Sequence, residues 1–258
     1  MRSKLPEKIE PASTYSKIAP VYDHLMRHVN YRQWFRYIES LVQTYRPNAQ
    51  TILELACGTG IMLEKFTKRK RLLLGVDNSL EMLKAAQKRL AGTHSNFFLC
   101  CGDMSAFAIR SDVDVAICLY DSINYCLTES EFQAALESVH RSLRQDGLFI
   151  FDVCTRRTCK NYFRALYEKD TFDGIDYIRK GRYDNKNDWQ INEFWLTNRC
   201  GNGETFFERH IQKIYLLKTI KKFLLQNNKW KILGIYHNFT RRPGTERSFR
   251  VHFVVRKI

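Results

Sequence analysis

The segment from Ile52 to Gly60 constrains the fold of this chain more than any other. It reads Ile-Leu-Glu-Leu-Ala-Cys-Gly-Thr-Gly, so a short apolar run ends in two closely spaced glycines. Such a run is typical of a strand buried on both faces, and glycines allow a tight turn that a ligand can approach closely. A helix through about Lys68 follows, and its first N–H groups are free to meet an anionic group. We therefore predict a strand, a ligand-binding turn and a helix.

Strand-like and helical segments alternate along the first 153 residues. The strand-like runs are apolar and β-branched, and they lie at residues 51–55, 71–77, 96–101, 113–119 and 147–153. Apolar residues at helical spacing occupy residues 14–46, 79–90 and 129–143. This alternation is typical of βαβ units, so it predicts a mostly parallel sheet with helices on both faces.

The second half of the chain follows a different pattern. Short strands and turn residues occupy about residues 172–215, with hairpin signals at 184–187 and 201–203. A helix at 215–226 and strands at 229–236 and 249–255 come next. We predict one α/β domain over residues 1–258, with a Rossmann-like, seven-stranded and mostly parallel sheet. A small antiparallel sheet is inserted at about residues 160–215.

Polar residues follow the predicted parallel strands at their carboxyl ends. Asp77 ends the second strand, Asp103 follows the third and is itself followed by the apolar Met104, and Asp121 follows the fourth. In open α/β sheets this edge forms the ligand crevice, and an acid after the second strand accepts hydrogen bonds from ribose hydroxyls. Ser79 competes with Asp77 for the helix N-cap, which leaves Asp77 free to hold a ligand.

Together these motifs resemble those of the class I S-adenosylmethionine-dependent methyltransferases. Glu54 to Gly60 is similar to the family's acidic-x-Gly-x-Gly-x-Gly motif, with Ala56 in place of the first glycine. Residues 15–23 resemble the N-terminal helix of small-molecule members, in which a tyrosine covers the cofactor carboxylate. The resemblance implies a methyltransferase that binds S-adenosylmethionine. The implied cofactor-binding residues are Tyr15, Glu54, Ala56, Gly58, Gly60, Asp77, Asn78, Asp103, Met104 and Leu119.

The expected reaction is an in-line transfer of a methyl group, for which positioning of donor and acceptor supplies most of the catalysis. Asp121 is the best candidate for a catalytic residue, because its place at a strand end faces the cofactor. Candidate substrate residues are Tyr22, Asn124 and Tyr125, although the tyrosines also suit a core or wall and the asparagine also suits a turn cap. From the insertion, His210 and Arg182 are weaker candidates, and we expect His210 on the surface. His140 is expected to be structural.

The inserted segment resembles that of aminosugar and amine N-methyltransferases, in which a small antiparallel sheet roofs the substrate. We therefore expect a small-molecule acceptor, with an amine, a hydroxyl and a carboxylate all open. The net charge of +15 suggests an alternative, an RNA methyltransferase, because residues 151–258 alone carry +12. Residues 121–124 read Asp-Ser-Ile-Asn and lack the Asn-Pro-Pro-aromatic motif of amino-directed nucleic-acid methylation, so RNA is not favoured.

The same residues bear on other classes of protein, on metal binding and on location in the cell. A dinucleotide-binding dehydrogenase requires a third glycine where Leu63 stands, whereas a binding module without activity stays open. The eight cysteines show no zinc-site spacing, so we expect small buried thiols and no metal. No apolar run is long enough to span a membrane, and the N-terminus lacks the pattern of a secretory signal. We expect a cytoplasmic protein and make no prediction of its oligomeric state.

Overall fold

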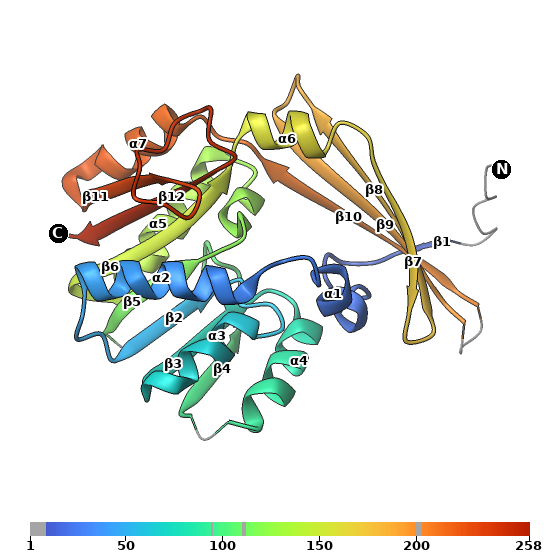
Figure 1. The fold of residues 1–258 in the computed structure, drawn as a ribbon, viewed down its shortest axis with the longest axis horizontal. Helices are drawn as coiled ribbons and strands as arrows, with labels where there is room; N and C mark the ends of the chain where they lie inside the picture. Colours follow the sequence, from blue (N-terminus) through green and yellow to red (C-terminus); the bar gives the residue numbers. More distant parts are fainter. Residues whose placement is uncertain (1–8, 94, 110–111, 200–202) are drawn as a thin grey trace.

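The computed structural model describes residues 9–93, 95–109, 112–199 and 203–258, and two β-sheets dominate it (Figure 1). The larger sheet has seven strands in the order β11-β12-β6-β5-β2-β3-β4. The central pairs are parallel, and β12 runs antiparallel to both of its neighbours. Its strands are β2 (Thr51–Leu55), β3 (Leu72–Asp77), β4 (Phe97–Cys101), β5 (Val113–Cys118), β6 (Leu143–Cys154), β11 (Trp230–His237) and β12 (Arg250–Lys257). The predicted seven-stranded, mostly parallel sheet is confirmed.

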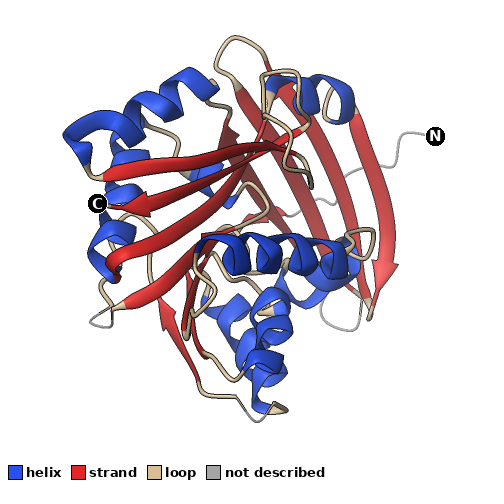
Figure 2. Ribbon diagram, turned by 60° about the vertical axis from the view of Figure 1, so that its left-hand side comes forward, coloured by secondary structure: helices blue, strands red, loops and turns tan. Residues whose placement is uncertain are grey.

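Helices cover both faces of this sheet because side chains alternate along each buried strand. In β2, Leu53 and Leu55 face the cluster that includes α5 and α7, whereas Ile52 faces the cluster that includes α2, α3 and α4. The helices are α2 (Tyr31–Tyr45), α3 (Ile61–Phe66), α4 (Leu80–Ala91), α5 (Glu129–Ser142) and α7 (Leu217–Leu225). Both layers are visible in Figure 2.

The second sheet has five strands in the order β1-β10-β9-β8-β7, and it lies beyond the carboxyl ends of the parallel strands (Figure 1). Its strands are β1 (Ile9–Pro11), β7 (Leu166–Phe172), β8 (Ile175–Asp184), β9 (Trp189–Asn198) and β10 (Thr205–Lys213). Helix α6 (Arg156–Tyr162) leads into it from β6. The antiparallel insertion is confirmed, but β1 adds a parallel strand that the sequence analysis did not predict. Neither β7 nor α6 was predicted.

The prediction of one helical region over residues 14–46 is wrong in its first part. The backbone of Tyr15 lies in the left-handed region at φ 64°, so the chain turns there and only then enters α1 (Ala19–Leu25). A second break precedes α2, whose first turn is capped by Asn30 through a bond from the Gln33 N–H. These turns carry the N-terminal segment between the two sheets.

The expectation of buried thiols is wrong for Cys100 and Cys101, which are exposed because β4 is an edge strand. The cysteines of the described residues are free, and the other five are buried. Cys200 and the first two residues of the predicted turn at 201–203 lie outside the described residues. Within those residues, no group of three or more His, Cys, Asp or Glu side chains is placed to hold a metal ion. None of the described helices combines the length and the apolar character needed to cross a bilayer.

Candidate active site

The turn after β2 is built from three residues in the left-handed region of backbone space. Ala56, Gly58 and Gly60 have φ values of 52°, 55° and 76°. At Gly60, a Cβ would lie 3.0 Å from the Cβ of Ala86, so a side chain there would crowd α4. At Ala56, an alanine occupies a left-handed backbone conformation that glycine adopts more easily.

Asp77, at the end of β3, holds this turn in place. Its Oδ2 accepts a hydrogen bond from the Gly58 N–H at 2.8 Å, and its Oδ1 accepts one from the Ser79 N–H at 2.9 Å. The hydroxyl of Ser79 caps α4 by accepting from the Met82 N–H. Burial raises the pKa of the Asp77 carboxyl above its ordinary value, although the two backbone donors oppose that shift.

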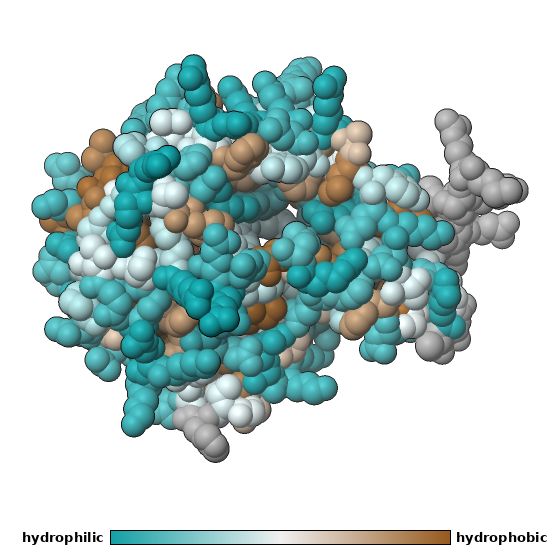
Figure 3. Space-filling view, in the orientation of Figure 1, coloured by the Kyte–Doolittle hydropathy of each residue, from teal (hydrophilic) through white to brown (hydrophobic). Residues whose placement is uncertain are grey.

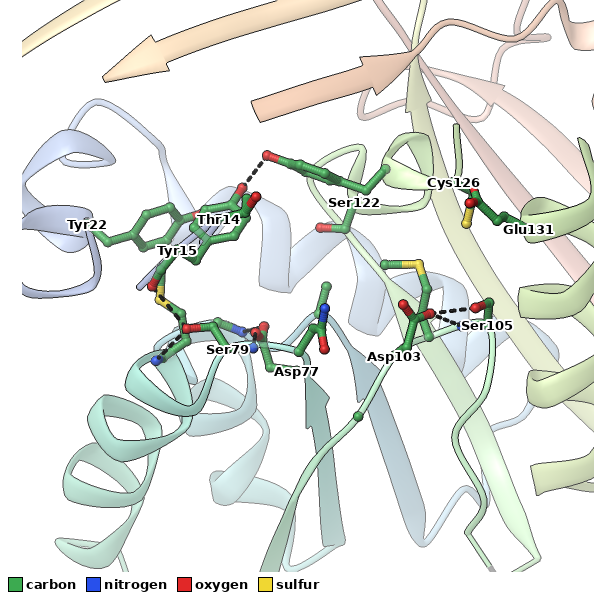
Figure 4. A pocket seen from close by; sticks show the side chains of 17 residues that line it. Thr14, Tyr15, Tyr22, Asp77, Ser79, Asp103, Ser105, Ser122, Cys126 and Glu131 are labelled. Atoms are coloured by element: carbon green, nitrogen blue, oxygen red, sulfur yellow. Dashed lines mark hydrogen bonds between the residues drawn. The ribbon is translucent and has the colours of Figure 1, made fainter. Parts of the chain in front are cut away.

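A cavity of about 280 Å³ lies against this turn, and we name it the glycine-turn chamber (Figure 4). Nine of the predicted residues line it: Tyr15, Tyr22, Ala56, Gly58, Asp77, Asn78, Asp103, Met104 and Tyr125. Three carboxylates face it, from Asp77, Asp103 and Glu131, and no Lys or Arg is among its described lining residues. A chamber with this charge favours a cationic ligand.

Three residues predicted to bind the cofactor are not among those that line the chamber. Glu54 is buried beneath the turn, and burial raises the pKa of its carboxyl well above the ordinary value. Its Oε2 has no hydrogen-bond partner among the described residues. Gly60 packs on α4, and Leu119 belongs to the core beside α2. None of the three therefore faces the chamber.

A second cavity of about 450 Å³ lies between the two sheets, and we name it the inter-sheet chamber. Figure 3 shows the molecular surface hollowed between the two parts of the molecule. Tyr15, Tyr22, Ser122 and Tyr125 line both chambers and form a shared wall. The two chambers are therefore neighbours, separated by three tyrosines and a serine.

A chain of hydrogen bonds starts at this shared wall. The hydroxyls of Tyr15 and Tyr125 are 2.6 Å apart, and the Tyr125 hydroxyl is 3.1 Å from Nδ1 of His210. Nε2 of His210 is 3.0 Å from Oε2 of Glu208. The expectation that His210 lies on the surface is wrong, because its side chain is only 3% exposed. Glu208, Arg179 and Arg250, which line or support the chamber, were not predicted.

Asp121 lies on the inter-sheet side, not on the wall of the glycine-turn chamber. Left-handed backbone at Tyr120 and Asp121 turns its side chain toward Arg250, whose Nη1 is 2.6 Å from Oδ1. The carboxylate also accepts from Nε2 of Gln212 at 2.8 Å. Burial raises the pKa of Asp121, and Arg250 opposes that rise. Asp121 is therefore a member of a buried ion pair.

The remaining candidates have structural surroundings. Asn124 is fully buried, and its side-chain amide donates to the Lys213 carbonyl at 2.6 Å, which fixes the end of β10. Arg182 is exposed, because the alternation of β8 turns Arg179 into the chamber and Arg182 away from it. His140 packs its ring against Trp230 and lines neither chamber.

Known proteins share both the sequence pattern and the fold. A family of methyltransferase domains matches residues 52–147. A Geobacillus sp. (strain WCH70) protein, named provisionally as a methyltransferase, is 28% identical over 257 residues, which cover 95% of this chain and 100% of the relative. A dTDP-3-amino-3,4,6-trideoxy-alpha-D-glucopyranose N,N-dimethyltransferase of Streptomyces venezuelae is 33% identical over 138 residues, covering 52% of this chain and 56% of the relative.

Solved structures agree over nearly the whole chain. A S-adenosylmethionine-dependent methyltransferase from Clostridium acetobutylicum ATCC 824 superposes with a TM-score of 0.79 at 24% identity, covering 93% of this chain and 98% of that one. A sugar N-methyltransferase from Streptoalloteichus sp ATCC 53650 gives 0.75 at 18% identity, covering 98% and 99%. Fold and sequence thus define a methyltransferase. The sequence pattern and the fold are those of a class I S-adenosylmethionine-dependent methyltransferase.

Proposed function

We propose that this enzyme transfers a methyl group in line to an amine nitrogen of a small molecule held in the inter-sheet chamber. The wall shared by the two chambers carries the proposal, since a donor in one and an acceptor in the other would meet at Tyr15, Tyr22 and Tyr125. The inter-sheet chamber, at about 450 Å³, has the size of a small-ligand pocket, roughly 300–1,000 Å³. The second sheet would be the roof over the acceptor.

The residues of the glycine-turn chamber fit S-adenosylmethionine. When bound, the cofactor supplies an electrophilic methyl group on a positively charged sulfur. Asp77 would accept hydrogen bonds from the ribose, Asp103 would accept from the adenine amino group, and Met104 would pack on the ring. Ala56 and Gly58 leave the backbone open to the amino-acid part. Asn78 lines the ribose side, whereas Glu54, Gly60 and Leu119 would hold the turn in shape.

Catalysis in this arrangement comes mainly from positioning. Holding two reactants in contact geometry can supply about 7–11 kcal/mol of the barrier. The rings of Tyr15 and Tyr22 meet edge to face, with centroids 5.7 Å apart, and they form one side of the shared wall. Aromatic faces attract cations and exclude water, so this wall suits a sulfonium on one side and an amine on the other.

One observation favours an amine over other acceptors. The Streptomyces venezuelae relative is named as an N,N-dimethyltransferase of an amino sugar nucleotide. In addition, polar groups of Arg179, Asn192 and Gln212 line the inter-sheet chamber, which suits a polar acceptor of any kind. Asp121 would contribute to this lining through its pair with Arg250, and Asn124 would act by holding β10.

The proposal is tested with S-adenosylmethionine that carries a deuterated methyl group and with a panel of acceptors. The panel holds sugar nucleotides with a primary amine, their hydroxyl counterparts, simple polyamines, carboxylic acids and total RNA. Mass spectrometry should find the labelled methyl group on an amine nitrogen and not on the matched hydroxyl compound. Transfer to RNA, to a hydroxyl or to a carboxylate in place of any amine would contradict the proposal.

A further inference from the structure

We infer that His210 is the general base that takes the proton from the acceptor ammonium, through the hydroxyl of Tyr125 and with Glu208 as its positioning residue. This inference rests on the proposed amine acceptor. An amine is largely an ammonium ion at neutral pH, and it becomes a nucleophile only after a proton is lost. The first group that accepts this proton must therefore lie at the wall where the methyl group is transferred.

The contacts of Glu208 determine which atom is the donor in each hydrogen bond from Glu208 through His210 to Tyr125. Its Oε1 accepts from the backbone N–H groups of Lys17 and Ile18, and its Oε2 accepts from the N–H of Tyr15 at 2.7 Å. An oxygen pair that receives three backbone donors is an acceptor, so His210 must donate its Nε2–H to it. That tautomer leaves the lone pair of Nδ1 to accept from the Tyr125 hydroxyl.

The Tyr125 hydroxyl then donates its hydrogen bond to His210, and it accepts one from the Tyr15 hydroxyl 2.6 Å away. Its remaining lone pair is available to an N–H of a ligand, because Tyr125 lines both chambers. Burial raises the pKa values of Tyr15 and Tyr125. Both side chains therefore stay hydroxyls and pass protons on, whereas the imidazole can keep one.

The surroundings of His210 place a carboxylate beside one nitrogen of its ring. Glu208 is fully buried and stands against Nε2, so protonation of His210 creates an ion pair shielded from water. The ring of Tyr15 meets the imidazole edge to face at 4.5 Å, and Phe194 meets it at 5.0 Å. The other charges near Tyr125 are those of Arg179, on β8, and Asp121, which oppose each other.

The proton and electron balance is complete without a further reagent. The acceptor ammonium gives one N–H proton to the Tyr125 oxygen as the Tyr125 hydroxyl gives its own proton to Nδ1 of His210. The freed nitrogen lone pair forms the N–C bond, and the carbon–sulfur bond breaks with its pair left on sulfur. His210 returns its proton to water when the product leaves the chamber.

The test uses His210→Gln and Tyr125→Phe in the full-length enzyme, with the best primary amine of the panel as acceptor. We expect kcat to fall about 10²- to 10⁴-fold in both variants. The affinity for S-adenosylhomocysteine, measured by calorimetry, should stay within a few-fold of the wild type. The rate of His210→Gln should also rise with pH until the amine itself loses its proton. Matched controls are His24→Gln and Tyr162→Phe, which line neither chamber and should keep full activity.

A second acceptor separates proton removal from a structural role. The aminooxy analogue of the same compound is a weak base, so it is already neutral at the assay pH and needs no base. We expect His210→Gln to methylate this analogue nearly as fast as the wild type. Equal losses on both acceptors, or no loss on the amine, would overturn the role of His210 while leaving the amine acceptor in place. Methylation of no amine by the wild type would overturn the proposed function itself.

Discussion

Replacing Asp77 with Asn should weaken the binding of S-adenosylmethionine about 10- to 150-fold. Each oxygen of this carboxylate already accepts one backbone N–H, at 2.8 and 2.9 Å, so each has one acceptor position left for a ribose hydroxyl. Asn supplies one oxygen and a misplaced donor, so one charge-assisted hydrogen bond is lost. Such a bond contributes about 1.5–3 kcal/mol, which sets the expected change in Kd.

The same substitution should change how stability depends on pH. Burial raises the folded-state pKa of Asp77 above 3.8, so folding favours the neutral acid. As pH rises through that pKa, the wild type loses stability that Asp77→Asn, which has no charge to bury, does not lose. Urea unfolding should therefore show the variant gaining stability relative to the wild type from acidic to neutral pH.

Calorimetry with S-adenosylmethionine is the assay for the affinity. The matched control is Asp184→Asn, at the half-buried last residue of β8, which lines neither chamber. Its affinity should equal that of the wild type. A Kd for Asp77→Asn within twofold of the wild type would refute the reasoning, because the carboxylate would then hold only its own turn.

The remaining predictions concern stability. Gly60→Ala should lower the free energy of unfolding by about 2–4 kcal/mol, because it adds left-handed backbone strain and a close contact with Ala86. Adding Ala86→Gly should recover only the part of this loss that comes from the contact. Urea unfolding of the single and double variants measures both effects. Arg250→Met should cost about 3–5 kcal/mol, because Asp121 and Asp152 would be left buried without their shared cation. Asp121→Asn should cost less, about 1–3 kcal/mol, since Asp152 still pairs with Arg250. A larger loss in Asp121→Asn than in Arg250→Met would contradict the view that Arg250 holds the pair together.

The main sheet could be predicted because its strands are buried on both faces. Such strands read as apolar runs, and β2 begins and ends at the residues that the sequence indicated. Strands β1 and β7 were not predicted, because neither contains a long apolar run. β1 has three residues, and the edge strand β7 alternates exposed and half-buried residues that include Glu168, Lys169 and Asp170. Their order comes from pairing with distant strands, which no local pattern reveals.

The chamber beneath the second sheet shows why the acceptor side was harder to predict than the cofactor side. In β10 the buried residues include Glu208, His210 and Gln212, whereas Arg209 between them is exposed. Alternation identifies the two faces of a strand but not which face meets water. The polar inner face of β10 was therefore expected to be exposed, and His210 with it. A turn such as Ala56 to Gly60 has no such ambiguity, because its glycines mark the backbone itself.

The most direct test of the central claim is a crystal structure with S-adenosylhomocysteine bound. We predict the ribose on Asp77, the adenine beside Asp103 and Met104, and the sulfur at the wall formed by Tyr15, Tyr22 and Tyr125, facing the inter-sheet chamber. A nucleoside bound in the inter-sheet chamber, or a sulfur directed away from that wall, would contradict the account.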